Sequence, residues 1–318
     1  MCKTIHYIDM FAGMGGFREG LTRAGDFVCM GHCEIDKYAD RSYRALFDTE
    51  GEWFIDDARK ADPKTMPDFE LLCGGFPCQT FSIAGNRRGF GDPRGTLFFE
   101  LARLAEARKP RYLLFENVPG LLSHEGGRTF ATILHTLDRL GYGVEWQVLN
   151  SKDFGVPQTR RRVYIVGYLD ERCRGKILPV IKTAGTSAVY FQPERQQMNS
   201  GSLRNTQEEI IGQPRAVNNP RITELEKNYK RMRKPGAPMF TLTTVDRHAV
   251  CYDSYIRRLT PRECLRLQGW TDDRIDKVLA IQSDNQVYKQ AGNGVTVNVV
   301  EAIGRRIIAA DAQLHEKN

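Results

Sequence analysis

Residues 4–17 read TIHYIDMFAGMGGF, a short apolar run that leads into a turn with three glycines. This combination is typical of the first strand of an α/β domain, where the glycines let a nucleotide-like ligand approach the backbone. The spacing is not the GxGxxG of dinucleotide folds, so it disfavours a nicotinamide cofactor. The stretch therefore predicts a ligand site at the carboxyl end of the first strand.

Similar apolar runs follow along the first half of the chain and alternate with amphipathic stretches, which is the rhythm of a doubly wound α/β sheet. The strands we expect cover residues 4–9, 27–34, 69–73, 112–116, 144–149 and 163–168. Apolar side chains recur at helical spacing between them, at positions 97, 101 and 104 and at 130, 133, 134, 137 and 140. These helices can cover both faces of the sheet.

The composition of the 318 residues is that of a globular protein, with 41% hydrophobic and 27% charged residues. Lys and Arg exceed Asp and Glu by 46 to 39, and the net charge of +7 favours a polyanionic partner. The eight cysteines have no zinc-site spacing, so we expect them to be reduced and expect no metal. No run approaches the roughly 18 apolar residues of a membrane span, and no signal-peptide pattern begins the chain. We therefore expect a cytoplasmic protein.

The rhythm is lost from about residue 171 to 255, where polar residues, prolines and glycines accumulate. A cluster there carries only positive charge and is compatible with a solvated face or a nucleic-acid contact; it comprises Lys227, Lys230, Arg231, Arg233 and Lys234. Thr260, Pro261 and Glu263 then form a helix start with a capping box. Val300, Ile303 and Ile307 share one helical face and predict a return to the first domain. We divide the chain at 1–185, 186–264 and 265–318.

Two acidic residues follow the glycine turn at later strand ends. Glu34 closes the second expected strand, where a carboxylate can accept hydrogen bonds from ribose hydroxyls, and Asp57 lies where it could meet an adenine amino group. Each alone is compatible with an ordinary turn or a surface acid. The ordered set of glycine turn, acid and acid indicates an adenosine-binding site.

A cysteine stands on a second glycine-containing turn, in GGFPCQ at residues 74–79. A lone Cys78 is more often structural, but an electropositive site at the sheet edge favours the thiolate. The following residues, 85–95, read GNRRGFGDPRG, a basic loop suited to closing over a phosphate backbone. If the strands are neighbours, Glu116 and the arginines of QTRRR at 158–162 join the thiol in one crevice.

In this order the motifs resemble those of the DNA cytosine-5 methyltransferases over nearly the whole chain. They are DMFAGMGG (9–16), GFPCQ (75–79), ENV (116–118), QTRRR (158–162), RRLTPREC (257–264) and QAGN (290–293). The resemblance implies a Rossmann-like methyltransferase domain, with a smaller irregular target recognition domain. The size is similar to that of bacterial or phage restriction-modification enzymes.

For such an enzyme the resemblance assigns the catalytic roles to Cys78, Glu116, Arg160 and Arg162. The Cys78 thiolate would add to C6 of a flipped-out cytosine, and Glu116, with a pKa raised by burial, would act at N3. Arg162 would bind the O2 side of the base with Arg160 beside it, while Asn117 shapes the turn. The base that removes the C5 proton stays unassigned.

The resemblance also implies S-adenosyl-L-methionine as cofactor, with S-adenosyl-L-homocysteine as product. Its site would comprise Phe11, Gly13, Gly16, Glu34, Ile35, Asp57, Ala58, Pro77, Leu97 and Asn293. The chain departs from many relatives at Ile35, where they have a tryptophan, and at Gly294, where they often have a serine. The partner would be double-stranded DNA, bound by Gln79, Ser82, Arg87, Arg88, Arg94, Arg231, Thr241, Leu242 and Arg247.

Other interpretations remain open. The tRNA-methylating branch of the same family carries a Cys-Phe-Thr triplet that this chain lacks, and a silent DNA-binding homologue would have lost the thiol or the acid. A DNA adenine methyltransferase would show an Asp- or Asn-Pro-Pro-aromatic motif, which does not occur. We expect a monomer. Whether a cognate restriction endonuclease acts separately, and which DNA sequence is recognised, are not encoded in these motifs.

Overall fold

The computed structural model describes residues 4–76, 97–180, 215–218, 232–244, 248–252 and 255–315. Within these ranges, no helix combines the length and the apolar composition that a membrane span requires.

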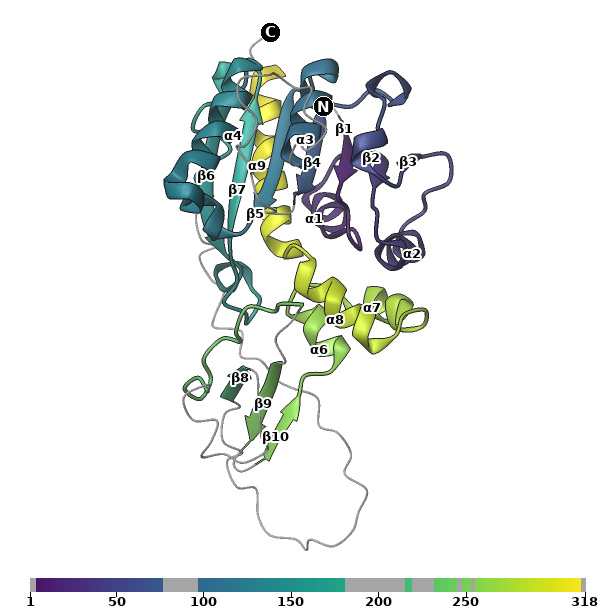
Figure 1. Cartoon of the computed structure of the whole chain (residues 1–318), viewed down its shortest axis with the longest axis vertical. Helices are drawn as coiled ribbons and strands as arrows, with labels where there is room; N and C mark the ends of the chain where they lie inside the picture. The colour runs from purple at the N-terminus through teal and green to yellow at the C-terminus, as the bar shows by residue number, and fades with distance from the viewer. Residues whose placement is uncertain are drawn as a thin grey trace, which may run out of the picture.

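A seven-stranded sheet forms the centre of the larger part of the molecule (Figure 1). Its strands are β1 (Ile5–Met10), β2 (Phe27–Cys33), β3 (Trp53–Ile55), β4 (Leu71–Gly75), β5 (Tyr112–Asn117), β6 (Gly143–Asn150) and β7 (Arg161–Tyr168). They lie in the order β3-β2-β1-β4-β5-β7-β6, with β7 antiparallel to both neighbours and the other pairs parallel. The order reverses between β1 and β4, and a reversal of this kind opens a crevice at the carboxyl ends of the strands.

The six expected strands are confirmed within one or two residues at each end, and the doubly wound α/β fold with them. The sequence did not indicate β3, which has only three residues, all of them partly exposed at the sheet edge. So short and exposed a strand shows neither a buried apolar run nor a period of two.

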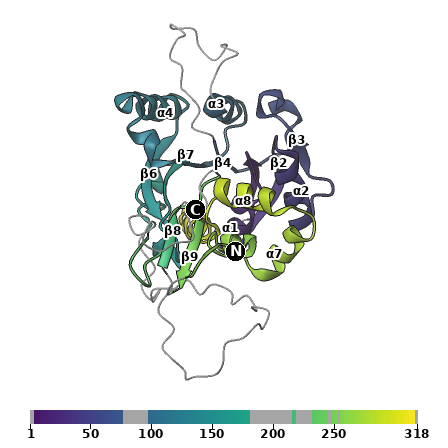
Figure 2. The same ribbon diagram turned by 60° about the horizontal axis from the view of Figure 1, so that its bottom comes forward.

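Helices cover both faces of this sheet, as expected. The helices α1 (Gly16–Ala24) and α9 (Val297–His315) pack on one face, and α3 (Leu97–Arg108) and α4 (Arg128–Arg139) on the other, as the turned view of Figure 2 shows. The buried apolar side chains form one cluster with α1 and α9, the first cluster, and another with α3 and α4, the second cluster. Neighbouring β1 residues confirm the two layers, since Tyr7 packs in the first cluster and Ile8 in the second. The expected return of the chain is also confirmed, because Val300, Ile303 and Ile307 are fully buried in the first cluster.

A smaller antiparallel sheet lies at the opposite end of the molecule from the chain termini (Figure 1). It contains β8 (Arg215–Asn218), β9 (His248–Tyr252) and β10 (Tyr255–Arg258) in the order β10-β9-β8. Between the two sheets lie α6 (Pro261–Arg266), α7 (Asp272–Leu279) and α8 (Asp284–Asn293), and α7 packs against α2 (Lys37–Leu46). Short 3-10 turns cover Ala58–Lys60, Pro63–Thr65, Pro119–Leu122, His124–Gly127, Ser151–Phe154 and Glu171–Cys173.

The helix start at Thr260 is confirmed in detail. The Thr260 hydroxyl accepts the Glu263 backbone N–H at 3.2 Å, and the Glu263 carboxylate accepts the Thr260 N–H at 2.8 Å. This reciprocal pair satisfies two backbone donors that a helix end would otherwise leave open. It fixes the point at which the chain leaves the small sheet and enters the helices beneath the large one.

Candidate active site

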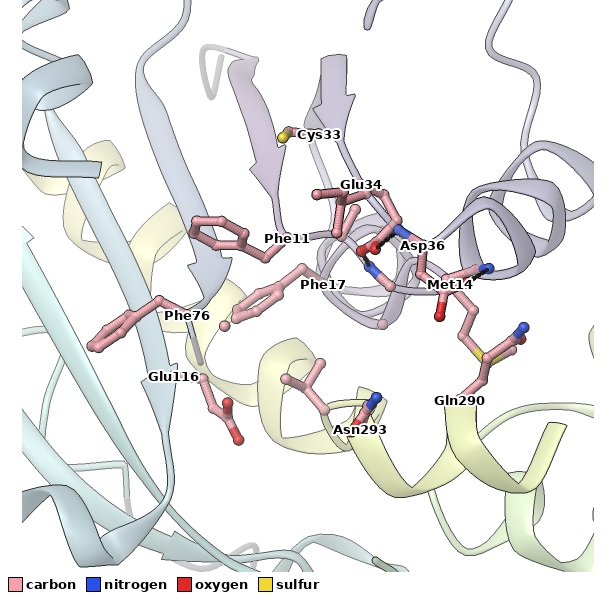
Figure 3. Close-up of a pocket in the computed structure, with 18 of the residues that line it drawn as sticks. Phe11, Met14, Phe17, Cys33, Glu34, Asp36, Phe76, Glu116, Gln290 and Asn293 are labelled. Atoms are coloured by element: carbon pink, nitrogen blue, oxygen red, sulfur yellow. Dashed lines mark hydrogen bonds between the residues drawn. The ribbon is translucent and has the colours of Figure 1, made fainter. Parts of the chain in front are cut away.

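A cavity of about 710 Å³ lies at the carboxyl ends of β1, β2, β4 and β5, between the large sheet and the C-terminal end of α8 (Figure 3). This is the edge at which the strand order reverses. The volume falls in the range of small-molecule sites, roughly 300–1,000 Å³. The first four motifs and the last one therefore meet at a single site, although about 280 residues separate the two ends of this set.

The glycine turn after β1 is held open toward this cavity by its backbone geometry. Phe11 has a φ of 55°, which an L side chain rarely adopts and which costs about 1–3 kcal/mol. Gly13 also has a positive φ, of 58°, and its N–H donates to Glu34 Oε2 at 2.7 Å. A Cβ added to Gly13 would meet no described atom within 4 Å and would enter open space. The turn thus presents its backbone to a ligand.

The two acids expected to bind a nucleoside both line the cavity. The Glu34 carboxylate accepts the N–H groups of Gly13 and Asp36, each at 2.7 Å. Burial raises the pKa of Glu34, and those two backbone donors oppose the shift. Asp57 forms an ion pair of 2.6 Å with Arg59 and caps the turn that follows, which holds its pKa below the usual range. The Glu34 carboxylate keeps further lone pairs for a ligand, whereas the Asp57 oxygens already accept four hydrogen bonds from Arg59, some of which a ligand would have to replace.

The residues expected at the cofactor converge. Nine of the ten line the cavity, namely Phe11, Gly13, Gly16, Glu34, Ile35, Asp57, Ala58, Leu97 and Asn293, while Pro77 lies outside the described residues. Ile35 keeps 68% of its surface exposed, which offers an apolar contact to a flat ring. An open glycine backbone, buried acceptors and an exposed apolar side chain together fit an adenosine-type group.

Glu116 and Arg162 form the polar end of the cavity. Arg162 Nε lies 2.9 Å from Glu116 Oε1, and both side chains are largely buried. Burial raises the pKa of Glu116, while the positive charges of Arg162 and Arg160 act in the opposite direction. The raised pKa agrees with the expectation for a carboxyl group that holds a proton. Figure 3 shows Glu116 projecting from the end of β5 into the cavity.

Asn117 ties β5 to the residue from which the chain enters the segment with the cysteine. Its Nδ2 donates to the Phe76 carbonyl at 2.8 Å, and its Oδ1 accepts the Val118 N–H at 2.8 Å. The side chain is 2% exposed, so water cannot replace these bonds without opening the structure. The expected turn-shaping role of Asn117 therefore extends to the start of the Pro77–Cys78 segment, which itself lies outside the described residues.

Substituting Asn117→Ala is expected to lower the free energy of unfolding by about 1–3 kcal/mol, because the buried Phe76 carbonyl loses its donor. Denaturant unfolding monitored by circular dichroism measures the change. Asn117→Asp keeps an acceptor for the Val118 N–H but not the donor, so it should lose a similar amount. An Asn117→Ala protein as stable as the parent would show that this bond contributes nothing.

Arg160 also lines the cavity, but its hydrogen-bond partners differ from those of Arg162. It is 1% exposed, and its terminal nitrogens donate to the carbonyls of Leu242 at 2.8 Å, Gly292 at 3.0 Å and Gly294 at 2.7 Å. The sequence places the two arginines side by side with one role, whereas the structure directs the terminal nitrogens of Arg160 to backbone groups. Sequence spacing cannot reveal this difference, because the acceptors come from distant segments.

The residues expected at DNA divide into two groups. Seven of them lie outside the described residues, namely Gln79, Ser82, Arg87, Arg88, Arg94, Arg231 and Arg247. Thr241 and Leu242 are described, and both engage the protein: the Thr241 hydroxyl donates to the Thr159 carbonyl at 2.6 Å, and Leu242 is 2% exposed in an apolar cluster. With its side chain buried, Leu242 has no surface for the DNA contact expected of it.

Sequence reasoning missed several residues of the cavity wall. Trp270, Lys289 and Gln290 line it from the helical region, and Lys289 forms an ion pair of 2.6 Å with Asp36. Gln290 belongs to the QAGN motif and lies one helical turn before Asn293, a spacing that could have indicated a shared face. Trp270 and Lys289 carry no comparable signal.

The six described cysteines are free and buried. Burial raises the pKa of Cys29 to about 11 and that of Cys33 and Cys264 to about 12, so these thiols stay protonated at neutral pH. No group of three or more potential metal ligands occurs among the described residues. Cys2 and Cys78 lie outside the described ranges.

Comparison with known proteins agrees with this geometry. A family model described as C-5 cytosine-specific DNA methylase matches residues 5–309. The type II methyltransferase M.NlaX of Neisseria lactamica is 37% identical, with 95% of this chain and 96% of that protein covered. M.SsoII of Shigella sonnei, also a type II methyltransferase, is 36% identical over 95% of this chain and 79% of its own length.

Among solved structures, the S. pombe Dnmt2 methyltransferase has the same fold, with a TM-score of 0.69 at 18% identity, and 98% of this chain and 99% of that chain are covered. The Entamoeba histolytica methyltransferase EhMeth gives a TM-score of 0.62, also at 18% identity, covering 96% of this chain and 98% of that chain. Taken with the family match over residues 5–309, the chain belongs to the C-5 cytosine-specific DNA methylase family.

Proposed function

We propose that this protein transfers a methyl group from S-adenosyl-L-methionine to C5 of a cytosine within a specific sequence of double-stranded DNA. The observation that carries the proposal is the buried Glu116–Arg162 pair, which faces the same cavity as the residues expected to bind the cofactor. A family match alone would not distinguish an active enzyme from a silent homologue. A buried carboxyl with a raised pKa beside a guanidinium supports an active one.

The cofactor would supply an electrophilic methyl group on a sulfonium. Phe11, Gly13, Gly16, Ile35, Ala58, Leu97 and Asn293 would hold it, with the carboxylates of Glu34 and Asp57 accepting its hydroxyl and amino protons and Pro77 adjoining the site. Three features of the cavity fit this cofactor: the open backbone of Gly13, the buried carboxylate of Glu34 and the exposed side chain of Ile35.

The protein's own residues would make the cytosine ring reactive. The Cys78 thiolate would form a bond to C6 and push the C5–C6 electron pair toward C5, which becomes nucleophilic. Glu116 would donate a proton or a strong hydrogen bond at N3, and Arg162 would bind the O2 side, so that the ring carries the added electrons. Loss of the C5 proton and expulsion of the thiolate would restore aromaticity after methylation.

The target base would have to leave the duplex to reach this cavity. Unstacking costs a few kcal/mol, which contacts in the cavity would recover, together with contacts from Arg87, Arg88 and Arg94, which lie outside the described residues. The net charge of +7 favours association with the phosphate backbone. We further propose that the protein acts as a monomer in the cytoplasm. A cognate endonuclease acting separately would fit the type II relatives, and its absence would fit an orphan enzyme.

The proposed function is tested by transfer of labelled methyl from S-adenosyl-L-methionine to unmethylated genomic DNA and, separately, to bulk tRNA. Label recovered from DNA as 5-methylcytosine would support the proposal, and bisulfite mapping would then give the recognised sequence. Label only in tRNA would assign the protein to the RNA-methylating branch. Label in neither substrate, with a folded protein that binds the cofactor, would favour a silent DNA-binding homologue.

Ile35→Trp is expected to strengthen cofactor binding by about 2- to 10-fold, because an indole adds roughly 0.5–1.5 kcal/mol of aromatic stacking beyond its buried area. Isothermal titration calorimetry with S-adenosyl-L-homocysteine measures the change. Val28→Trp, at an exposed β2 position away from the cavity, serves as the control for an added surface indole. Weaker binding by the Ile35 variant would show that the adenine does not lie against this side chain.

A further inference from the structure

We propose that Arg160 is a positioning residue that locks the target recognition segment, residues 239–244, against the active-site cavity. It would act through hydrogen bonds to backbone carbonyls of this segment and of the end of α8, and not by touching the reacting base. The inference rests on the proposed function for its effect on DNA, but the lock itself is a feature of the fold and is tested separately below.

The contacts of Arg160 join three segments that are far apart in the sequence. One terminal nitrogen donates to Leu242 in the recognition segment, and the other donates to Gly292 and Gly294 at the end of α8. No carboxylate of the described residues forms an ion pair with this guanidinium, although it is 1% exposed. A buried charge held by carbonyl groups is costly to disturb, so these bonds fix the relative position of their segments.

Gln158 makes a second connection of the same kind. Its Nε2 donates to the Leu267 carbonyl at 2.8 Å, and its Oε1 accepts the Leu242 N–H at 2.9 Å. The backbone N–H and carbonyl of Leu242 are thus both hydrogen-bonded to side chains of the QTRRR motif, since Arg160 donates to the carbonyl. Gln158 is fully buried, so this pairing is protected from water.

The backbones of the two segments also pair directly. The Met239 N–H donates to the Pro157 carbonyl at 2.7 Å, and the Thr159 N–H donates to the Met239 carbonyl at 2.8 Å. On the other side, a Cβ added to Gly292 would lie 2.6 Å from the Thr243 carbonyl carbon. The recognition segment is therefore enclosed between QTRRR and the glycine of QAGN, with no space for it to shift toward either.

The position of Arg160 connects the recognition segment with the residues expected to act on the base. Arg160 precedes Arg162 by two residues, and Arg162 forms the ion pair with Glu116. A movement of the recognition segment would pull on the same short stretch that carries Arg162 into the cavity. We infer that Arg160 keeps the recognition side chains in register with the flipped base, so that its loss relaxes the choice of target sequence.

Arg160→Met tests this directly, because methionine keeps an unbranched side chain that fills part of the same space and removes every donor. The rate of methyl transfer at the sequence mapped for the parent enzyme is compared with the rate at sites that differ from it by one base pair. We expect the ratio of the two rates to fall by about tenfold, a large part of what one mismatched base pair is worth. The ratio is independent of how much protein is folded, since both rates come from one preparation.

Two further variants distinguish the effect of the Arg160 hydrogen bonds from effects of its charge and of protein stability. Arg160→Lys keeps the charge, but one ammonium cannot replace a planar fork that reaches two segments, so the ratio should still fall. Arg111→Met removes a cation paired with the buried Asp311, at the amino end of β5 and away from the cavity. It is expected to lower stability but to leave the ratio at the parent value.

Amide hydrogen exchange of the full chain without DNA tests whether Arg160 holds these segments together, and the result does not depend on which substrate the enzyme methylates. Arg160→Met should accelerate exchange about tenfold in residues 239–244 and 290–295, with the protection of β1, β4 and β5 unchanged. Unchanged exchange in those two segments would overturn the proposal, as would a lower turnover with an unchanged ratio, which would indicate that Arg160 contacts the base. If the parent transfers no methyl to DNA, the proposed function fails while exchange still decides on the lock.

Discussion

Cys78→Ala is expected to abolish methyl transfer to DNA, lowering the rate by a factor of about 10⁴ or more, as loss of a covalent nucleophile does elsewhere. Without the thiolate no bond forms at C6, and C5 stays too poor a nucleophile to accept the methyl group. Binding of S-adenosyl-L-homocysteine should be close to that of the parent, because the expected cofactor contacts come from other residues. Single-turnover transfer and calorimetry on the same preparation measure the two effects.

The matched control is Cys173→Ala. Cys173 is fully buried at the end of the sheet opposite the cavity, and burial raises the pKa of its thiol, so it cannot serve as a nucleophile. DNA with 5-fluorocytosine at the target adds a direct readout, because fluorine cannot leave C5 as a proton does and the adduct should persist in denaturing gels. The parent and Cys173→Ala should form this complex, and Cys78→Ala should not. Transfer or a complex with Cys78→Ala would place the nucleophile elsewhere.

The strands of the large sheet could be predicted from the sequence because most of them are buried on both faces. Residues 71–75 and 112–117 are apolar runs that end in turn or acidic residues, and burial on two faces leaves no polar alternation to confuse the pattern. The short β3 lacks such a signal. Its position beside β2 depends on pairing with a neighbour, which is a tertiary effect.

The cavity could be predicted to the extent that its residues end strands. Glu34 and Glu116 each follow an apolar run, and parallel strands bring their carboxyl ends to one edge. Contributions from α8 were harder to foresee, because only packing brings Lys289 against Asp36. A resemblance to a family supplied Asn293, which the residues alone did not indicate.

The two arginines of QTRRR show where sequence reasoning ends. Arg160 and Arg162 have the same chemistry and are separated by one residue, so a motif assigns them one role. In the structure Arg162 pairs with a carboxylate, whereas Arg160 binds the carbonyls of residues 82 to 134 positions away. The side chain of Leu242 was likewise expected at DNA and is buried instead. Long-range partners of this kind leave no local trace in the sequence.

Glu116→Gln is expected to lower the turnover number by about 10²–10⁴, the usual contribution of a positioned general acid. Glutamine has nearly the same shape and can still accept a hydrogen bond from Arg162, so the fold should be retained. It can offer N3 a hydrogen bond but no proton. Steady-state methyl transfer at saturating DNA and cofactor, with thermal unfolding as a check of the fold, measures the loss.

The pH profile distinguishes proton donation by Glu116 from simple binding. Burial raises the pKa of Glu116, so its carboxyl stays protonated to higher pH than an ordinary glutamic acid, and turnover should decline as pH rises through that raised pKa. Ionisation of Cys78 imposes the opposite trend, which gives the parent a bell-shaped profile. Glu116→Gln should lose the alkaline decline and keep the acid limb, whereas Glu70→Gln, at the amino end of β4 beside His6, should keep both limbs. A Glu116→Gln enzyme that still declined at the same alkaline pH would show that another group supplies the proton, and Glu116 would then be left with a role in binding N3 alone.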